Sequence, residues 1–485
     1  MNLENRMSLR SVGRALGLVL LGMGLSHCKG DPDVPDAGVD ADVPPAQTMV
    51  RDAKLLEVDA RQTFLLSVKV DGTYAQALPS GEPSRIAGTA ERAVVASDGG
   101  AVVLWSPQGE GLGRTVWLWR PGTPAAIALT TRAWSVAHDP GMSFVAFKEY
   151  DPGSGMNSVR VARTDTCTFE ACPLWTALEV PSRNLSFLAG GTTLLASEGT
   201  QAWLIDVPSR TLTELGPTAA YPVLAADGAR YALFDAANHV QVFDTATRTL
   251  QWEQVWRDEA TRKDWHVSNA FMTDGGTLIL NIKADRTPET DSVACDATGC
   301  RDMEGGLCRN WERSPGVVLC LIDRWLTPND FTRDAEYLDV TGHVLVDTAT
   351  TSRASVYPAF SADLRNQAWT VRETQGGARV DTLRWNAPEG TRQAPLEGLV
   401  DNVLFTFTPD ARQVLFSRVL TPAEGKTEHR LSLWDGEAVS DLAVLKDAPF
   451  LNPIPPMVRD NPPTLYMTVT RGDGWPTSVI RVPLP

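Results

Sequence analysis

Short apolar runs alternate with polar turns along nearly the whole chain after residue 50. In each unit an apolar segment meets a turn marked by Asp or Gly, and a nearly continuous apolar run follows, as in Val414-Leu415-Phe416. Such a run is typical of a strand buried on both faces. A third segment alternates apolar and polar residues, and a fourth is polar and rich in Thr and Leu. The pattern predicts four short antiparallel strands per unit and disfavours α/β folds.

The turns share a recurring string, which is clearest where DARQTFLLS at Asp59 is compared with DARQVLFS at Asp410. Seven more turns align with these two, at Asp98, Asp139, Gly190, Asp227, Asp274, Asp363 and Asp460. Most lie roughly 40–50 residues apart, the period of a propeller blade. We therefore predict an all-β fold, a single β-propeller of four-stranded antiparallel blades over 49–485. We prefer eight blades, with seven or nine as alternatives, and expect 46–58 to donate a closing strand.

One interval between turns is about twice as long as the others. We assign it to a Cys-rich insertion at 284–316, which breaks the apolar alternation between a second and a third strand. A long loop without regular structure is usually functional or disordered, and cysteine cross-links favour an ordered loop. We therefore expect an ordered excursion at one face of the propeller.

The first 45 residues follow a different pattern. Arg6, Arg10 and Arg14 precede an apolar core at Ala15–Leu25, which is too short to span a bilayer and typical of a signal peptide at 1–27. The segment 28–48 is rich in Asp, Pro and Ala, a composition that cannot bury enough apolar surface to fold. We expect it to be a disordered tether; an ordinary secretory signal is the alternative to the lipoprotein signal described below.

Charge and cysteine usage narrow the class of protein. The formal net charge of −15 argues against nucleic acid as a partner. Six cysteines remain beyond Cys28 and fall into local pairs, as expected for disulfides in an exported chain: Cys167 with Cys172, Cys295 with Cys300, and Cys308 with Cys320. A zinc site is disfavoured, because CxxC and HxxxH spacings are absent.

Two resemblances follow from these residues. The repeated turn and its apolar run resemble the WD-like repeat of TolB-type β-propellers, which implies a scaffold used by many unrelated proteins. Leu25-Ser26-His27-Cys28 resembles a bacterial lipobox, from which His27 departs, since a small residue is usual there. With the tether and the high Arg-to-Lys ratio it is similar to lipoproteins of myxobacterial type. The resemblance implies lipidation of Cys28 and an outer-membrane protein facing the periplasm or the cell surface.

No catalytic residues are assigned from the sequence. No GxSxG motif is present, and the repeats leave no room for a hydrolase domain. We predict a monomeric scaffold that binds a protein or a cell-envelope component, with enzymatic activity uncertain and less favoured. The alternative is a polysaccharide lyase or hydrolase that uses His138, His266, Asp285 and Asp302. No cofactor is expected; the alternative is calcium, bound by acidic residues of the insertion: Asp285, Glu289, Asp291, Asp296, Asp302 and Glu304.

Overall fold

The computed structural model describes residues 46–485, which belong to one compact unit, Val43–Pro485. Short gaps in this description lie at 109–112, 152–155, 169–170, 180–183, 199–200, 218–221, 226–227, 235–238, 257–263, 274, 286–289, 304–306, 311–315, 328–329, 340–343, 348–357, 376–377, 421–426, 446–447, 451–455 and 471–475. The predicted signal peptide, Cys28 and most of the predicted tether lie outside the described residues. Within them, no helix is long and apolar enough to cross a membrane.

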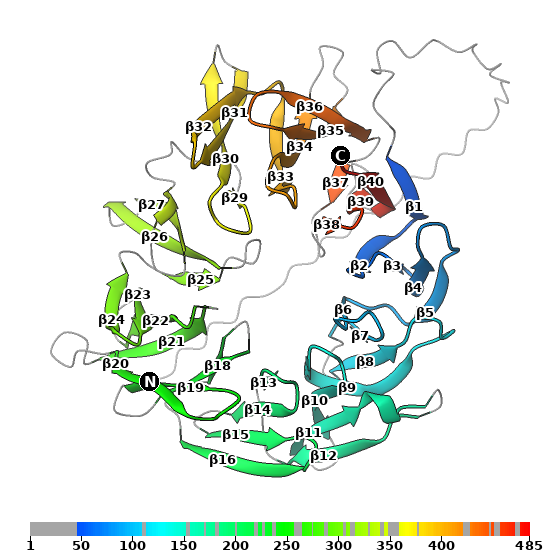
Figure 1. The fold of residues 1–485 in the computed structure, drawn as a ribbon, viewed down its shortest axis with the longest axis vertical. Coiled ribbons are helices and arrows are strands. Elements are labelled where there is room, and N and C mark those ends of the chain that lie inside the picture. The colour runs from blue at the N-terminus through cyan, green and yellow to red at the C-terminus, as the bar shows by residue number, and fades with distance from the viewer. Residues whose placement is uncertain are drawn as a thin grey trace, which may run out of the picture. The chain divides into compact units, whose positions relative to one another are not determined.

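The described strands form nine antiparallel sheets (Figure 1). Seven of these sheets have four strands each, hydrogen-bonded in chain order. The first three are β2 (Lys54–Val58), β3 (Phe64–Lys69), β4 (Gly72–Ala77) and β5 (Ser84–Ala87); β13 (Asn184–Phe187), β14 (Thr193–Glu198), β15 (Gln201–Asp206) and β16 (Thr211–Pro217); and β17 (Val223–Leu224), β18 (Arg230–Phe234), β19 (His239–Asp244) and β20 (Leu250–Val255).

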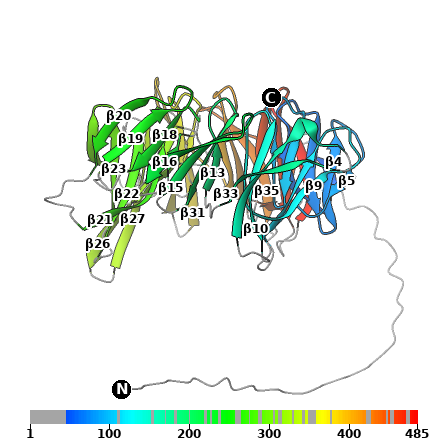
Figure 2. The same cartoon turned by 90° about the horizontal axis from the view of Figure 1, so that it is seen from below.

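The next two four-stranded sheets are β21 (Trp265–Met272), β22 (Leu278–Ala284), β23 (Thr290–Asp296) and β24 (Gly299–Met303); and β25 (Cys308–Asn310), β26 (Val317–Thr327), β27 (Asp330–Asp339) and β28 (Val344–Asp347). The last two are β29 (Ala359–Phe360), β30 (Gln367–Gln375), β31 (Ala378–Ala387) and β32 (Gly390–Pro395); and β33 (Leu399–Phe407), β34 (Val414–Leu420), β35 (Glu428–Trp434) and β36 (Val439–Leu445). Figure 2 shows the hairpin of β26 and β27 reaching beyond the neighbouring strands.

A seven-stranded sheet contains two repeats that share one strand. Its strands are β6 (Arg92–Val95), β7 (Val102–Trp105), β8 (Arg114–Trp119), β9 (Ile127–His138), β10 (Phe144–Asp151), β11 (Met156–Arg163) and β12 (Leu174–Leu178). The twelve-residue β9 pairs with β8 through its first half and with β10 through its second half. It is therefore the fourth strand of one repeat and the first strand of the next. A 3₁₀ turn, η1 (Thr164–Thr166), lies between β11 and β12.

The remaining sheet joins the two ends of the unit. It contains β37 (Ala448–Phe450), β38 (Met457–Asp460), β39 (Pro463–Thr470), β40 (Pro476–Pro483) and β1 (Gln47–Arg51). β1 pairs antiparallel with β40, with Gln47 opposite Arg481 and Arg51 opposite Ser478. The start of the folded unit thus completes the last sheet, as the sequence predicted.

Clusters of buried side chains join each repeat to the next. One cluster packs Leu56 and Phe64 of the first repeat against Leu104 of the second, and others continue in chain order. The series ends where Tyr466 and Val479 of the last sheet pack against Leu65 of the first. Because every sheet is packed between its neighbours and the last returns to the first, the unit is a closed β-propeller.

Burial within the repeats follows the predicted pattern. The second strands are buried on both faces: Val414 to Ser417 in β34 are all buried, as are Leu278 to Ile282 in β22. The fourth strands are largely exposed; β20 and β32 are examples. An inner strand of a sheet that is packed on both sides is mostly apolar on both faces, whereas an outer strand keeps one face in water.

The stretch 284–316 departs from the sequence analysis, which expected an insertion. β23 and β24 are the third and fourth strands of one sheet, and β25 is the first strand of the following sheet. The interval of double length therefore contains a further repeat, whose first two strands are β25 and β26. The described strands form nine sheets, and the seven-stranded sheet holds two repeats.

The reason for this difference lies in the cysteines. Cys295 and Cys308 are fully buried strand residues, in β23 and β25 respectively. Buried cysteine behaves as a small hydrophobic residue. The sequence analysis counted these residues as loop cross-links and so missed the apolar positions of two strands.

Candidate functional site

The Asp residues that mark the repeats stabilise turns. The Asp59 carboxylate, 2% exposed, accepts the backbone N–H groups of Thr63 at 2.6 Å and Phe64 at 2.8 Å. Asp139 accepts the N–H of Gly141 at 3.1 Å and that of Phe144. These carboxylates satisfy backbone donors that the tight turn leaves without partners. They have a structural role and do not form a ligand-binding set.

A second kind of turn follows the third strand of two consecutive repeats, in DVPSRT at 206–211 and DTATRT at 244–249. The Asp206 carboxylate accepts the N–H of Ser209 at 2.9 Å, and the Asp244 carboxylate accepts that of Thr247 at 2.8 Å. Hydrogen bonds from Ser209 lower the pKa of Asp206. Each turn ends on an arginine with a φ of 59°, Arg210 in the first and Arg248 in the second. The two arginines are therefore held in the same backbone conformation.

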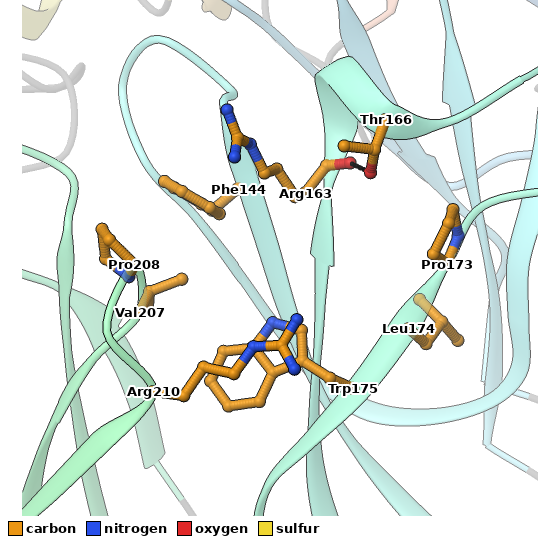
Figure 3. A pocket seen from close by; sticks show the side chains of 9 residues that line it. All are labelled: Phe144, Arg163, Thr166, Pro173, Leu174, Trp175, Val207, Pro208 and Arg210. Atoms are coloured by element: carbon orange, nitrogen blue, oxygen red, sulfur yellow. Dashed lines mark hydrogen bonds between the residues drawn. The ribbon is translucent and has the colours of Figure 1, made fainter.

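A cavity of about 440 Å³ lies between the sheet that contains β9–β12 and the sheet of β13–β16 (Figure 3). One wall is the turn between β15 and β16, and the other is the segment that links β11 to β12. Apolar side chains form most of the lining, together with two arginines and one threonine. The lining residues are Phe144, Arg163, Thr166, Pro173, Leu174, Trp175, Val207, Pro208 and Arg210.

The two arginines of the cavity differ in their surroundings. Arg163 forms a two-pronged ion pair with Asp165, with Nε–Oδ1 and Nη2–Oδ2 distances of 2.8 Å. The guanidinium of Arg210 lies over the indole of Trp175, with Cζ 5.3 Å from the ring centroid. Among the described residues, no carboxylate lies within ion-pair distance of Arg210. Within the described part of the cavity wall, Arg210 is therefore the arginine whose charge has no carboxylate partner.

The predicted cysteine pairs are disulfides in the structure: Cys167–Cys172, Cys295–Cys300 and Cys308–Cys320. The last two join residues directly opposite each other, across β23–β24 and across β25–β26. The first lies between Thr166 of η1 and Pro173, two residues that line the cavity. It thus constrains one wall of the candidate site. The predicted lipidation site, Cys28, lies outside the described residues.

The four residues proposed for a polysaccharide-cleaving site do not converge. His266 and Asp285 meet, with Nδ1 2.6 Å from Oδ1, but both side chains are more than half exposed. Asp302 lies in β24, at the opposite edge of the sheet from His266 in β21. His138 ends β9 in another sheet, where its Nδ1 lies 3.1 Å from the carbonyl oxygen of Asp139. The cavity described above is lined by none of the four.

In the part of the chain that the structure describes, no group of three or more His, Cys, Asp or Glu side chains is arranged to hold a metal ion. Of the acidic residues named for calcium, Glu289 and Glu304 lie outside that part. Asp296 instead closes the β23–β24 turn, where it accepts the N–H of Thr298 at 2.8 Å and pairs with Arg301 at 2.9 Å.

The cavity residues were not identified from the sequence. Trp175 and Arg210 belong to different repeats, so no local spacing records their contact. The sequence does contain a partial signal. The Asp-x-x-Ser/Thr-Arg-Thr turn occurs in two consecutive repeats, and the repeat before the first of these turns contains Trp175. Only the packing of neighbouring sheets shows which arginine meets an aromatic ring.

Comparison with known proteins adds little to this geometry. No family model matches the chain, and no curated protein is similar to it in sequence. A solved eukaryotic initiation factor is 10% identical with a TM-score of 0.46, covering 82% of this chain and 98% of its own. A putative TolB from Agrobacterium tumefaciens is 11% identical with a TM-score of 0.27, covering 42% and 82%. Porphyromonas gingivalis dipeptidyl peptidase 4 is 9% identical with a TM-score of 0.41, covering 88% and 65%. At such values none of them assigns a function to this chain.

Proposed function

We propose that this protein is an exported, membrane-anchored β-propeller that binds a protein of the cell envelope and catalyses no reaction. The observation that carries the proposal is the cavity of about 440 Å³ between two repeats. Its walls come from separate sheets that the closed ring holds in a fixed relation, and a site on such rigid elements is preorganised for binding. The lining combines apolar surface with one arginine, Arg210, that has no ion-pair partner among the described residues, and such a mixture is the usual composition of a binding pocket.

The anchor is the second part of the proposal. A lipid on Cys28 would hold the chain at the membrane surface in proportion to its buried CH₂ groups, and the part of the tether before β1, 28–46, would separate the membrane from the propeller. We propose a monomer at the outer membrane, facing the periplasm or the cell surface. Replacing Cys28 with Ala should move the full chain from the membrane fraction to the soluble fraction. Retention of this variant in the membrane fraction would contradict the lipid anchor.

The polysaccharide-cleaving alternative is not proposed. It required at least two of its residues to converge in a cleft, and the pair that does meet, His266 and Asp285, is exposed. A general acid or base acts on a substrate that the site positions. An exposed pair of this kind provides no such positioning.

Binding at the cavity can be tested with two matched variants. Pro208 and Ala246 occupy the same position of the two Asp-x-x-Ser/Thr-Arg turns and are both exposed, but only the turn of Pro208 lines the cavity. Pro208→Trp should therefore fill the cavity, whereas Ala246→Trp adds the same bulk to a neighbouring turn. We expect the full-length protein and the Ala246→Trp variant to capture the same envelope protein by cross-linking, and Pro208→Trp to lose it. Equal capture by Pro208→Trp, or no reproducible capture at all, would overturn the proposal.

A further inference from the structure

The position of Arg210 is fixed by its own turn and by the neighbouring repeat. The Asp206 carboxylate accepts the N–H and the hydroxyl of the preceding Ser209. Arg210 itself adopts a φ of 59°, and its guanidinium lies against Trp175 of β12. A guanidinium that lies over the face of an indole can still donate its N–H groups to an acceptor. Figure 3 shows Arg210 over the indole of Trp175 at one side of the cavity.

The partner that fits this arrangement carries a carboxylate. Two parallel N–H groups of an arginine match the two oxygens of a carboxylate, and such charged pairs are stronger than neutral hydrogen bonds. The other arginine is already paired with Asp165 at 2.8 Å. One carboxylate therefore matches the charge of Arg210, which has no ion-pair partner among the described residues.

The rest of the lining is apolar and favours a peptide over a sugar. Phe144, Leu174 and Val207 offer no hydrogen-bonding groups, and the Thr166 hydroxyl already donates to the Arg163 carbonyl oxygen at 2.7 Å. A uronic acid would bury several hydroxyl groups against this surface without partners, at a cost for each group. An acidic residue with apolar neighbours satisfies both parts of the lining.

We propose that the cavity binds a peptide segment in which an Asp or Glu side chain pairs with Arg210 and flanking apolar residues contact the walls. This inference rests on the proposed binding function and names its ligand class. The chain as a whole has a formal net charge of −15, which repels an acidic partner at long range. Recognition must therefore come from the local contact with Arg210.

The test uses the full-length protein and an array of synthetic peptides. Each peptide places Glu among Leu, Pro and Trp neighbours and has a counterpart with Gln in place of Glu; oligogalacturonate is a separate probe. The wild-type protein should bind the best Glu peptides about 10–100-fold more tightly than their Gln counterparts, as expected for a charged hydrogen-bonded pair. Arg210→Gln should abolish this difference, and the matched Arg248→Gln should retain it. Circular dichroism and thermal melting check that both variants are folded.

A second substitution separates charge from geometry. Arg210→Lys keeps the charge but loses the planar, two-pronged contact, so its preference for Glu over Gln should fall between those of wild type and Arg210→Gln. Equal binding of Glu and Gln peptides by the wild-type protein, or binding of oligogalacturonate in their place, would overturn the inference. Capture of an envelope protein that Pro208→Trp abolishes would still support the proposed function after such a result. The inference and the proposed function can therefore fail separately.

Discussion

Arg459, in the last sheet, donates from Nη2 to Oε1 of Glu57 in the first sheet at 2.7 Å, across 402 residues of sequence. The same guanidinium donates to the Val58 carbonyl oxygen, from Nε at 3.0 Å and from Nη2 at 2.7 Å. Nearby, the Tyr466 hydroxyl donates to Gln62 at 3.0 Å. These bonds join the two ends of the ring at a place separate from the pairing of β1 with β40.

Replacing Arg459 with Met should weaken this closure. The change leaves the Glu57 carboxylate and the Val58 carbonyl oxygen without their donor in a partly buried site, so the free energy of unfolding should fall by about 1–3 kcal/mol. Urea denaturation measures this difference. Arg365→Met is the control, because the Arg365 side chain is 76% exposed and lies 3.9 Å from Asp363. An exposed pair of this kind contributes about 0–1 kcal/mol. Equal losses in the two variants would contradict a specific closing role for Arg459.

The same contact predicts a pH dependence. Burial raises the pKa of Glu57 above its ordinary value of 4.5, although Arg459 acts in the opposite direction. Because the folded state binds this proton more tightly than the unfolded state, the associated stability is complete below about pH 4.5 and is lost as pH rises through the folded-state pKa. Glu57→Gln cannot ionise and avoids this loss. Its melting temperature relative to wild type should therefore be higher at pH 7 than at pH 4; the opposite trend would show that the ionised pair is the more stable form.

The two DARQ strings occupy different positions of the same turn. In the first turn the N–H of Gln62 donates to the carbonyl oxygen of Asp59 at 2.9 Å, and in the second the N–H of Ala411 donates to that of Thr408 at 2.8 Å. Gln62 and Ala411 have φ values of 54° and 57°. Asp59 therefore corresponds to Thr408, two residues before the Asp410 with which the sequence aligned it. Identical letters identified the repeat but misplaced its register.

This offset predicts unequal effects of identical substitutions. Asp59→Ala removes a buried acceptor from several backbone N–H groups and should cost about 2–3 kcal/mol of unfolding free energy. Asp410→Ala, at a side chain that is 59% exposed, should cost about 0.5–1 kcal/mol. Thr408→Val, at the position equivalent to Asp59, should cost more than Asp410→Ala, because its hydroxyl accepts the N–H of Gln413 at 3.1 Å. Chemical denaturation of the three variants gives the order, and equal costs for the two Asp substitutions would support the alignment by letters.

The fold class was predictable because the same pattern of buried and exposed positions recurs in each four-stranded repeat. A second strand such as β34 belongs to a sheet that is packed on both sides, so its apolar run Val414-Leu415-Phe416 is visible in the sequence. The register of the repeated turn and the sharing of one strand by two repeats are harder to predict from the sequence. The twelve residues of β9 serve two repeats, and Cys295 and Cys308 are strand residues that resemble loop cross-links in a sequence. The cavity was not predictable, since Arg210 and Trp175 meet only through packing between repeats.

A buried carboxylate joins two later sheets, and its substitution should cost more stability than substitution of an exposed carboxylate. Asp381 in β31, fully buried, accepts from Arg372 Nε and Nη2 and from the N–H of Val400 in β33, each at 2.8 Å. Asp381→Ala leaves the guanidinium and a buried N–H without this partner, and the loss of stability should be about 3–5 kcal/mol. Asp363→Ala, at an exposed pair, is the control. A loss below 1 kcal/mol for Asp381→Ala would show that the surroundings relax and hydrate the arginine.

Two disulfides of equal sequence separation allow an effect on the cavity to be distinguished from an effect on overall stability. Cys167–Cys172 and Cys295–Cys300 have the same sequence separation of 5, so replacing either pair with Ala should cost about 2 kcal/mol of unfolding free energy in the chain-entropy treatment. Only the first lies between two residues that line the cavity, Thr166 and Pro173. Binding of the Glu peptides should therefore weaken when Cys167 and Cys172 are replaced and stay unchanged in the control pair, as calorimetry would measure. If both pairs weakened binding alike, the effect would follow overall stability, and the first disulfide would have no special part in shaping the cavity.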